Sequence, residues 1–203
     1  MSQKADKPVV WVLLSGGIDS AACAAFYLRQ GFAVETLYID YGQAAAKHEE
    51  VAAAAIAERF GVPHVRYMWS GGSIKGSGEI CGRNAFLLFG ALMEIGNRHG
   101  LLAIGLHSGT PYYDCGESFM SATQLLLDGC TDGRIKAVAP FLTWNKREIW
   151  EFCIDCGVAL GLTYSCEKGS DKPCGECLSC LDRRTLNAVS NLSDSTHAVW
   201  SES

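Results

Sequence analysis

The sequence has no hydrophobic run long enough to cross a membrane. Its first apolar stretch, Val9–Leu14, is far shorter than the roughly 20 residues that a membrane-spanning helix needs. The residues before it, Met1–Pro8, are polar and lack the apolar centre of a secretory signal peptide. We therefore expect a cytoplasmic protein with no membrane partner.

Positive charge is also scarce. Lysine and arginine together number 17 against 22 acidic residues, so the net charge is −5. This balance argues against a long polyanion as the main partner, although backbone amides can still bind a small anion. There is no internal repeat and no low-complexity tract. With 203 residues, 48% of them hydrophobic, the chain suits one α/β domain with a small appendage.

Short apolar runs alternate with helical stretches along most of the chain, which predicts an open, mostly parallel sheet with helices on both faces. We expect residues 1–160 to form this domain and residues 161–203 to pack on it as one unit. The expected strands are Val9–Leu14, Val34–Asp40, Val65–Trp69, Leu101–Leu106 and Ile135–Ala139. The expected helices are Ala21–Gln30, Ala44–Phe60, Arg83–His99, Ser118–Leu127, a helix capped by Thr143 that ends near Cys156, and one from about Leu181.

The segment Ser15–Ser20, with the sequence SGGIDS, directly follows the first expected strand. A strand, a tight glycine turn and a helix would direct backbone N–H groups and two hydroxyls toward one point at the positive end of a helix dipole. No lysine follows the glycines, so this is not a Walker loop. SGGxDS instead resembles the fingerprint of the PP-loop pyrophosphatases, which bind ATP and usually cleave it between the α- and β-phosphates.

Two further segments, Tyr41–Gln43 and His107–Cys115, follow other expected strands. The carboxyl ends of parallel strands meet at one edge of a sheet, where ligands bind. Three motifs at the same edge are what an active site requires. A glycine-rich loop at Ser70–Gly78 would be either a lid over this pocket or a docking surface.

Ten cysteines in a cytoplasmic protein indicate thiols or metal ligands rather than disulfides. Four of them are close enough in sequence to supply a tetrahedral, structural zinc site: Cys166, Cys174, Cys177 and Cys180. A rival set joins Cys153 and Cys156 to Cys174 and Cys177. We prefer the first set because Cys153 lies within an amphipathic helix, where a buried thiol is ordinary.

Taken together, these motifs resemble the QueC family of PP-loop enzymes over nearly the whole chain. The resemblance depends on the following segments: SGGIDS at Ser15–Ser20, YGQ at Tyr41–Gln43, GRN at Gly82–Asn84, Lys146 with Glu148 and Ile149, SCxKG at Ser165–Gly169, and the cysteines at 174, 177 and 180. The combination of these zinc ligands with SGGxDS is specific, because PP-loop relatives that thiolate tRNA or form NAD do not normally carry both.

The resemblance implies an ATP-dependent ligase that converts 7-carboxy-7-deazaguanine to 7-cyano-7-deazaguanine. ATP activates the carboxylate, ammonia forms an amide, and the activated amide loses water. The resemblance implies that ATP is bound by Ser15, Gly16, Gly17, Ser20, Tyr41 and Gln43. It implies that Arg83 and Lys146 neutralise the charge of pyrophosphate. It also implies that Arg83 and Asn84 contact the deazaguanine base of the substrate. Asp19 would hold Mg²⁺, because a carboxylate beside phosphates needs a cation between them. The alternative is that Asp19 caps the helix. We expect a homodimer by resemblance only.

The chain departs from the family's motifs at two places. Cys81 stands where the family usually has proline, and the loop Ser108–Gly116 lacks an arginine that the family carries, because Gly116 replaces it. Asp114 is still expected to read the N–H edge of a deazapurine, and Tyr112 or Tyr113 to stack on its face.

Three functions remain open, and the altered loop is the reason for considering the second. The first is the free-standing ligase that uses ammonia. The second is a QueC-like enzyme that transfers the activated acyl group to an amine on a protein or nucleic acid. The third is an inert ATP-binding scaffold whose zinc segment contacts other proteins.

Overall fold

The computed structural model describes residues 7–69 and 79–189, so the loop expected at Ser70–Gly78 and the polar tail from Asn191 lie outside them. The elements are β1 (Val9–Leu13), α1 (Ile18–Arg29), β2 (Ala33–Asp40), α2 (Ala46–Phe60), β3 (His64–Met68), α3 (Arg83–Ile95), β4 (Gly100–Ala103), α4 (Glu117–Thr131), β5 (Ile135–Val138), α5 (Lys146–Asp155) and α6 (Leu178–Val189). Two short 3₁₀ turns cover Tyr113–Cys115 and Leu160–Leu162.

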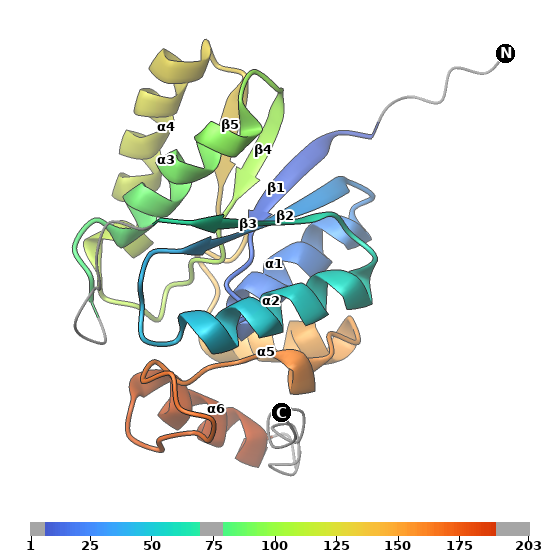
Figure 1. The fold of residues 1–203 in the computed structure, drawn as a ribbon, viewed down its shortest axis with the longest axis vertical. Helices are drawn as coiled ribbons and strands as arrows, with labels where there is room; N and C mark the ends of the chain where they lie inside the picture. The colour runs from blue at the N-terminus through green and yellow to red at the C-terminus, as the bar shows by residue number, and fades with distance from the viewer. Residues whose placement is uncertain (1–6, 70–78, 190–203) are drawn as a thin grey trace, which may run out of the picture.

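The five strands form one sheet in the order β3-β2-β1-β4-β5, and every described pairing is parallel. Helices α1, α2 and α5 cover one face of this sheet, and α3 and α4 cover the other (Figure 1). The predicted fold class is therefore confirmed. Both faces need covering because a parallel sheet joined by helical crossovers is apolar on each side.

The central strand β1 shows how the sequence builds both layers. Val10 and Val12 pack into the cluster beneath α1 and α5, while Trp11 and Leu13 pack into the cluster beneath α3 and α4. Successive side chains of a strand point to opposite faces. The continuous apolar run Val9–Leu14 therefore serves two cores at once.

Several element boundaries differ from the sequence predictions. Helix α1 begins at Ile18 rather than Ala21, because Gly17 is its N-cap, and α3 ends at Ile95, where Gly96 adopts a positive φ of 60°. Strand β4 ends at Ala103, since the chain then leaves the sheet toward the site described below. Helix α6 begins at Leu178, before the expected Leu181.

The prediction of Thr143 as the cap of α5 is wrong. The cap is Asn145, whose side-chain oxygen accepts hydrogen bonds from the N–H groups of Arg147 and Glu148, both at 3.0 Å. The Glu148 carboxylate accepts in return from the Asn145 N–H at 2.7 Å. This reciprocal capping box satisfies more backbone donors than a cap two residues earlier would.

The segment after Leu160 packs against the α/β layers. The buried Arg183 of α6 donates to the Thr163 hydroxyl at 2.6 Å and to the Leu160 carbonyl at 2.7 Å. Leu186, one turn further on, joins the apolar cluster beneath α1 and α5. The helix is thus attached to the main fold by both polar and apolar contacts.

Candidate active site

A cavity of about 470 Å³ opens at the carboxyl edge of the sheet. Strands β1 and β4 are neighbours there, and the chain leaves them toward opposite sides, since β2 lies beyond β1 and β5 beyond β4. Such a topological switch point is where open α/β sheets bind ligands. The lining includes residues from the exits of β1, β2 and β4 and from the N-terminal end of α5, together with part of the segment after Leu160.

The SGGIDS loop forms the floor of this cavity. Gly16 has φ +80°, and a Cβ added there would lie 2.6 Å from the Glu49 carbonyl and 2.7 Å from the Ala52 Cβ, so α2 packs directly on the loop. The Ser20 hydroxyl donates to the Gly17 carbonyl at 3.0 Å and lies 3.2 Å from the Ser15 hydroxyl. The first turn of α1 thereby faces the cavity, as a site for an anion requires.

Lys146 and His107, which come from two other parts of the chain, meet Asp19 of this loop. The Lys146 ammonium donates to Asp19 Oδ2 at 2.5 Å, and His107 Nε2 lies 3.9 Å from the same oxygen. The other carboxylate oxygen, Asp19 Oδ1, is buried and has no hydrogen-bond partner within the described residues. A carboxylate oxygen in that state fits a divalent cation, which prefers oxygen ligands.

The exit of β2 contributes a polar group to the wall. The Gln43 amide donates to Glu49 at 2.7 Å and to the Tyr38 hydroxyl at 3.0 Å, and its oxygen accepts from the Tyr41 N–H at 2.9 Å. Burial raises the pKa of the Glu49 carboxyl, which the Gln43 hydrogen bond and the Arg83 charge partly oppose. Tyr41 and Gln43 both line the cavity. The Gln43 amide is fixed there by its hydrogen bonds to Tyr38, Tyr41 and Glu49.

The loop after β4 and the start of α3 are hydrogen-bonded to each other. The Asn84 side chain donates to the Asp114 carbonyl at 2.9 Å, and the Asn84 N–H donates to the Asp114 carboxylate at 3.2 Å. Arg83, Asn84, Tyr112 and Cys115 line the cavity, whereas Asp114 is not among its lining residues. Burial raises the pKa of the Cys115 thiol to about 11, so this thiol is protonated at neutral pH.

The structure adds wall residues that the sequence analysis did not name as candidates. They include His107, Glu49, Tyr164, Asp182 and Arg183. His107 was within a segment expected at this edge, but no local pattern distinguished it. The last three residues belong to the cysteine-rich part of the chain, and only folding brings them to the cavity.

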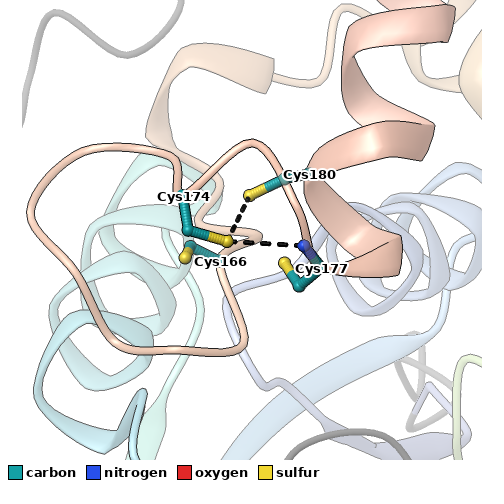
Figure 2. Close-up of side chains that lie close together, drawn as sticks. All are labelled: Cys166, Cys174, Cys177 and Cys180. Carbon is teal, nitrogen blue, oxygen red and sulfur yellow. Dashed lines mark hydrogen bonds between the residues drawn. The ribbon is translucent and has the colours of Figure 1, made fainter.

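The four cysteines Cys166, Cys174, Cys177 and Cys180 come together, with all four sulfurs within 4.8 Å of one another (Figure 2). Cys174 Sγ lies 3.9 Å from Cys180 Sγ and accepts a hydrogen bond from the Cys177 N–H at 3.4 Å. Four thiolates in this arrangement suit a closed tetrahedral zinc site. Cys153 is instead fully buried in α5, and Cys156 accepts from Arg29 at 3.0 Å, so neither joins the cluster.

The fold and the cluster define the class: an α/β protein with a parallel five-stranded sheet and a C-terminal four-cysteine site. The sequence profile of the family described as "Queuosine biosynthesis protein QueC" matches residues 9–78 and 73–189. The chain belongs to the QueC family. No helix in the described ranges is long and apolar enough to span a membrane.

Individual relatives agree with this membership. The chain is 32% identical to a protein named 7-cyano-7-deazaguanine synthase from Koribacter versatilis, in an alignment that covers 89% of each chain. It is 31% identical over 199 residues to a protein of the same name from a Synechococcus strain, covering 83% of this chain and 87% of that one. A solved structure, NMN synthetase from Francisella tularensis, is more distant, with a TM-score of 0.44 and 12% identity over 97% of this chain and 84% of that chain.

Proposed function

We propose that the protein is an ATP-dependent carbon–nitrogen ligase that activates the carboxylate of 7-carboxy-7-deazaguanine, or a close analogue, and yields 7-cyano-7-deazaguanine with ammonia. The names of the relatives support this substrate class. The observation that carries the proposal is the position of the SGGIDS loop. The loop lies at the switch point of the sheet, and its Asp19 pairs there with Lys146. The proposal places the enzyme in the cytoplasm as a homodimer.

The chemistry requires positioning and charge neutralisation rather than a nucleophilic side chain. A carboxylate is a poor electrophile because its leaving group would be oxide, and transfer to AMP supplies a phosphate leaving group instead. Ser15, Gly16, Gly17 and Ser20 would bind the phosphates through the loop, and Tyr41 and Gln43 would contact the nucleotide. Lys146 and Arg83 would stabilise the negative charge that develops as pyrophosphate leaves.

Asp19 is the residue of this chain that would hold Mg²⁺, because its Oδ1 is buried and has no hydrogen-bond partner within the described residues, while Lys146 pairs with Oδ2. The bound ion would shield the charge of the triphosphate. Zn²⁺ would be held by the four cysteines, away from the reacting atoms. The metal would fix the loops that carry these cysteines. Arg83, Asn84 and Tyr112 would contact the base, with Asp114 orienting Asn84 through its two hydrogen bonds.

A second candidate is transfer of the activated acyl group to an amine on a protein or nucleic acid. The observation that favours it is Gly116, which caps α4 where the resembled family has an arginine in its substrate loop. Because glycine has no side chain, position 116 places no positive charge beside the site where the amine would bind. A larger amine would then have room beside the activated base.

The two candidates separate in one experiment. The protein is incubated with 7-carboxy-7-deazaguanine, ATP, Mg²⁺ and ammonium, and AMP and the base are followed by mass spectrometry. AMP together with the nitrile supports the ligase, and AMP without nitrile favours transfer to another amine. Absence of AMP rejects both. Asp19→Ala and Ser20→Ala must abolish the AMP signal, which also excludes an inert scaffold.

A further inference from the structure

His107 is held rigidly at the exit of β4. Two residues before it, Gly105 packs on the first turn of α1 so closely that a Cβ would lie 2.8 Å from the Asp19 carbonyl. One residue after it, Ser108 donates to the Trp144 carbonyl from its N–H at 2.9 Å and from its hydroxyl at 2.8 Å. The loop is therefore fastened both to α1 and to the segment that leads into Lys146.

The orientation of the His107 ring follows from Gly109. The Gly109 N–H donates to His107 Nδ1 at 3.0 Å, and a Cβ at Gly109 would lie only 3.0 Å from the same atom. A backbone N–H can only donate, so Nδ1 must accept with its lone pair. The hydrogen of the neutral ring is then on Nε2, because the partner of one ring nitrogen decides the tautomer.

Nε2 of His107 is directed toward Asp19 in the SGGIDS loop. It lies 3.9 Å from Asp19 Oδ2 and 3.5 Å from the Thr110 hydroxyl, and the side chain is 12% exposed. The charged groups that face the ring are Asp19, Lys146 and Asp182. Burial and the Lys146 charge lower the pKa of His107, while Asp19 and Asp182 oppose this shift. Because the Gly109 N–H occupies Nδ1, the ring offers its Nε2–H to the cavity.

We propose that His107 is a catalytic hydrogen-bond donor, whose Nε2–H contacts a non-bridging oxygen of the α-phosphate of ATP during adenylation. This inference rests on the proposed function. In that step a carboxylate oxygen of the substrate attacks the α-phosphorus, and the bond from this phosphorus to the bridging oxygen breaks. Pyrophosphate leaves with the electron pair, and no proton is transferred. A fixed donor aimed at oxygens that gain charge lowers the barrier.

The tautomer excludes a role as general base. Nδ1 is occupied by the Gly109 N–H, and Nε2 already carries its hydrogen, so the ring has no lone pair to offer in the cavity. Protonation of the ring would add a hydrogen at Nδ1 and leave the hydrogen on Nε2 in place. The rate of adenylation should therefore show no acidic limb that depends on His107.

Substitutions that move the donor test this role. His107→Gln places an amide nitrogen near the position of Nε2, whereas His107→Asn reaches only the position of Nδ1, and His107→Ala has no donor. We expect kcat for AMP formation to fall about 100-fold in the Ala and Asn variants and less than about 10-fold in Gln, with little change in the KM for ATP. Gln as slow as Ala, or an acidic limb that Gln abolishes, would overturn the proposal.

A second measurement does not depend on turnover. In protein labelled with ¹⁵N-histidine, the signal missing from His107→Gln assigns the ring, and we expect the Nε2–H tautomer. Adding Mg²⁺ and ATP should shift its Nε2–H proton downfield. If wild-type protein makes no AMP, the proposed function fails, and the NMR spectrum still decides separately whether the Nε2–H of His107 contacts ATP. An Nδ1–H tautomer, or a proton signal that ATP leaves unchanged, rejects it.

Discussion

The backbone N–H of Tyr164 donates to the carbonyl of Gly16 at 2.9 Å. Tyr164 lies two residues before the first cysteine of the cluster, and Gly16 lies in the SGGIDS loop. A second contact reinforces the first: a Cβ at Gly169 would lie 2.0 Å from the Ala44 carbonyl, so this glycine lets the cysteine segment reach the exit of β2. The four-cysteine site is therefore mechanically connected to both sides of the cavity.

Metal removal should weaken nucleotide binding as well as folding. We expect Cys174→Ser with Cys177→Ser to lose zinc, lower Tm and reduce ATP affinity by about 10-fold or more, the equivalent of one lost interaction of about 1.4 kcal/mol. Elemental analysis, thermal unfolding and calorimetry measure the three quantities. As a matched control, Cys153→Ala with Cys156→Ala should retain one equivalent of zinc. Loss of the metal in that control would show that our choice of ligands is wrong.

Gly16→Ala should destabilise the protein and abolish ATP binding. The new Cβ would clash with the Glu49 carbonyl in α2, and its φ of +80° costs a non-glycine residue about 1–2 kcal/mol even without a clash. Urea unfolding gives the change in free energy. Gly129→Ala, at an exposed position inside α4 with open space around it, should instead stabilise by about 0.5–1 kcal/mol. Equal effects of the two changes would contradict the packing described here.

Lys146→Ala should reduce kcat for AMP formation by about 100-fold, since it removes the cation beside Asp19 and the loop. Lys136→Ala serves as the control, because Lys136 also pairs with an aspartate, Asp128, but does not line the cavity. The assay is release of AMP with saturating carboxylate substrate. A similar loss in both variants would assign the effect to overall charge rather than to position.

Glu49→Gln should stabilise the protein at neutral pH. Burial raises the pKa of this carboxyl in the folded state, so the folded protein binds its proton more tightly than the unfolded chain does. The stability contributed by this group is therefore complete below the unfolded pKa of about 4.3 and is lost as the pH rises from there through the raised pKa of the folded state. The difference between variant and wild type should grow from pH 4 to pH 7 in urea unfolding curves. Exposed Glu58 of the same helix supplies the control Glu58→Gln, and an equal gain there would argue against burial as the cause.

Local patterns predicted most of the sheet and the three motifs at its edge. The strands, the turn at Gly16 and Gly17 and the cysteine set could be read because each depends on neighbours in sequence. The start of α6 could not. The Glu167 carboxylate, which lies before the helix in a separate turn, accepts hydrogen bonds from the Ser179 N–H at 3.1 Å and the Ser179 hydroxyl at 2.8 Å. That contact satisfies the first turn of α6 from a distance.

The sequence alone determined the local conformations and the residue types available for chemistry, because hydrophobic periodicity, glycine turns and cysteine spacing act over a few residues. Only the tertiary structure decided which of these residues meet. His107, Asp19 and Lys146 are far apart along the chain and share one point because the strand order β3-β2-β1-β4-β5 brings their loops to the same edge. The same holds for Tyr164 and Gly16, whose contact depends on how the last segment packs across the finished sheet.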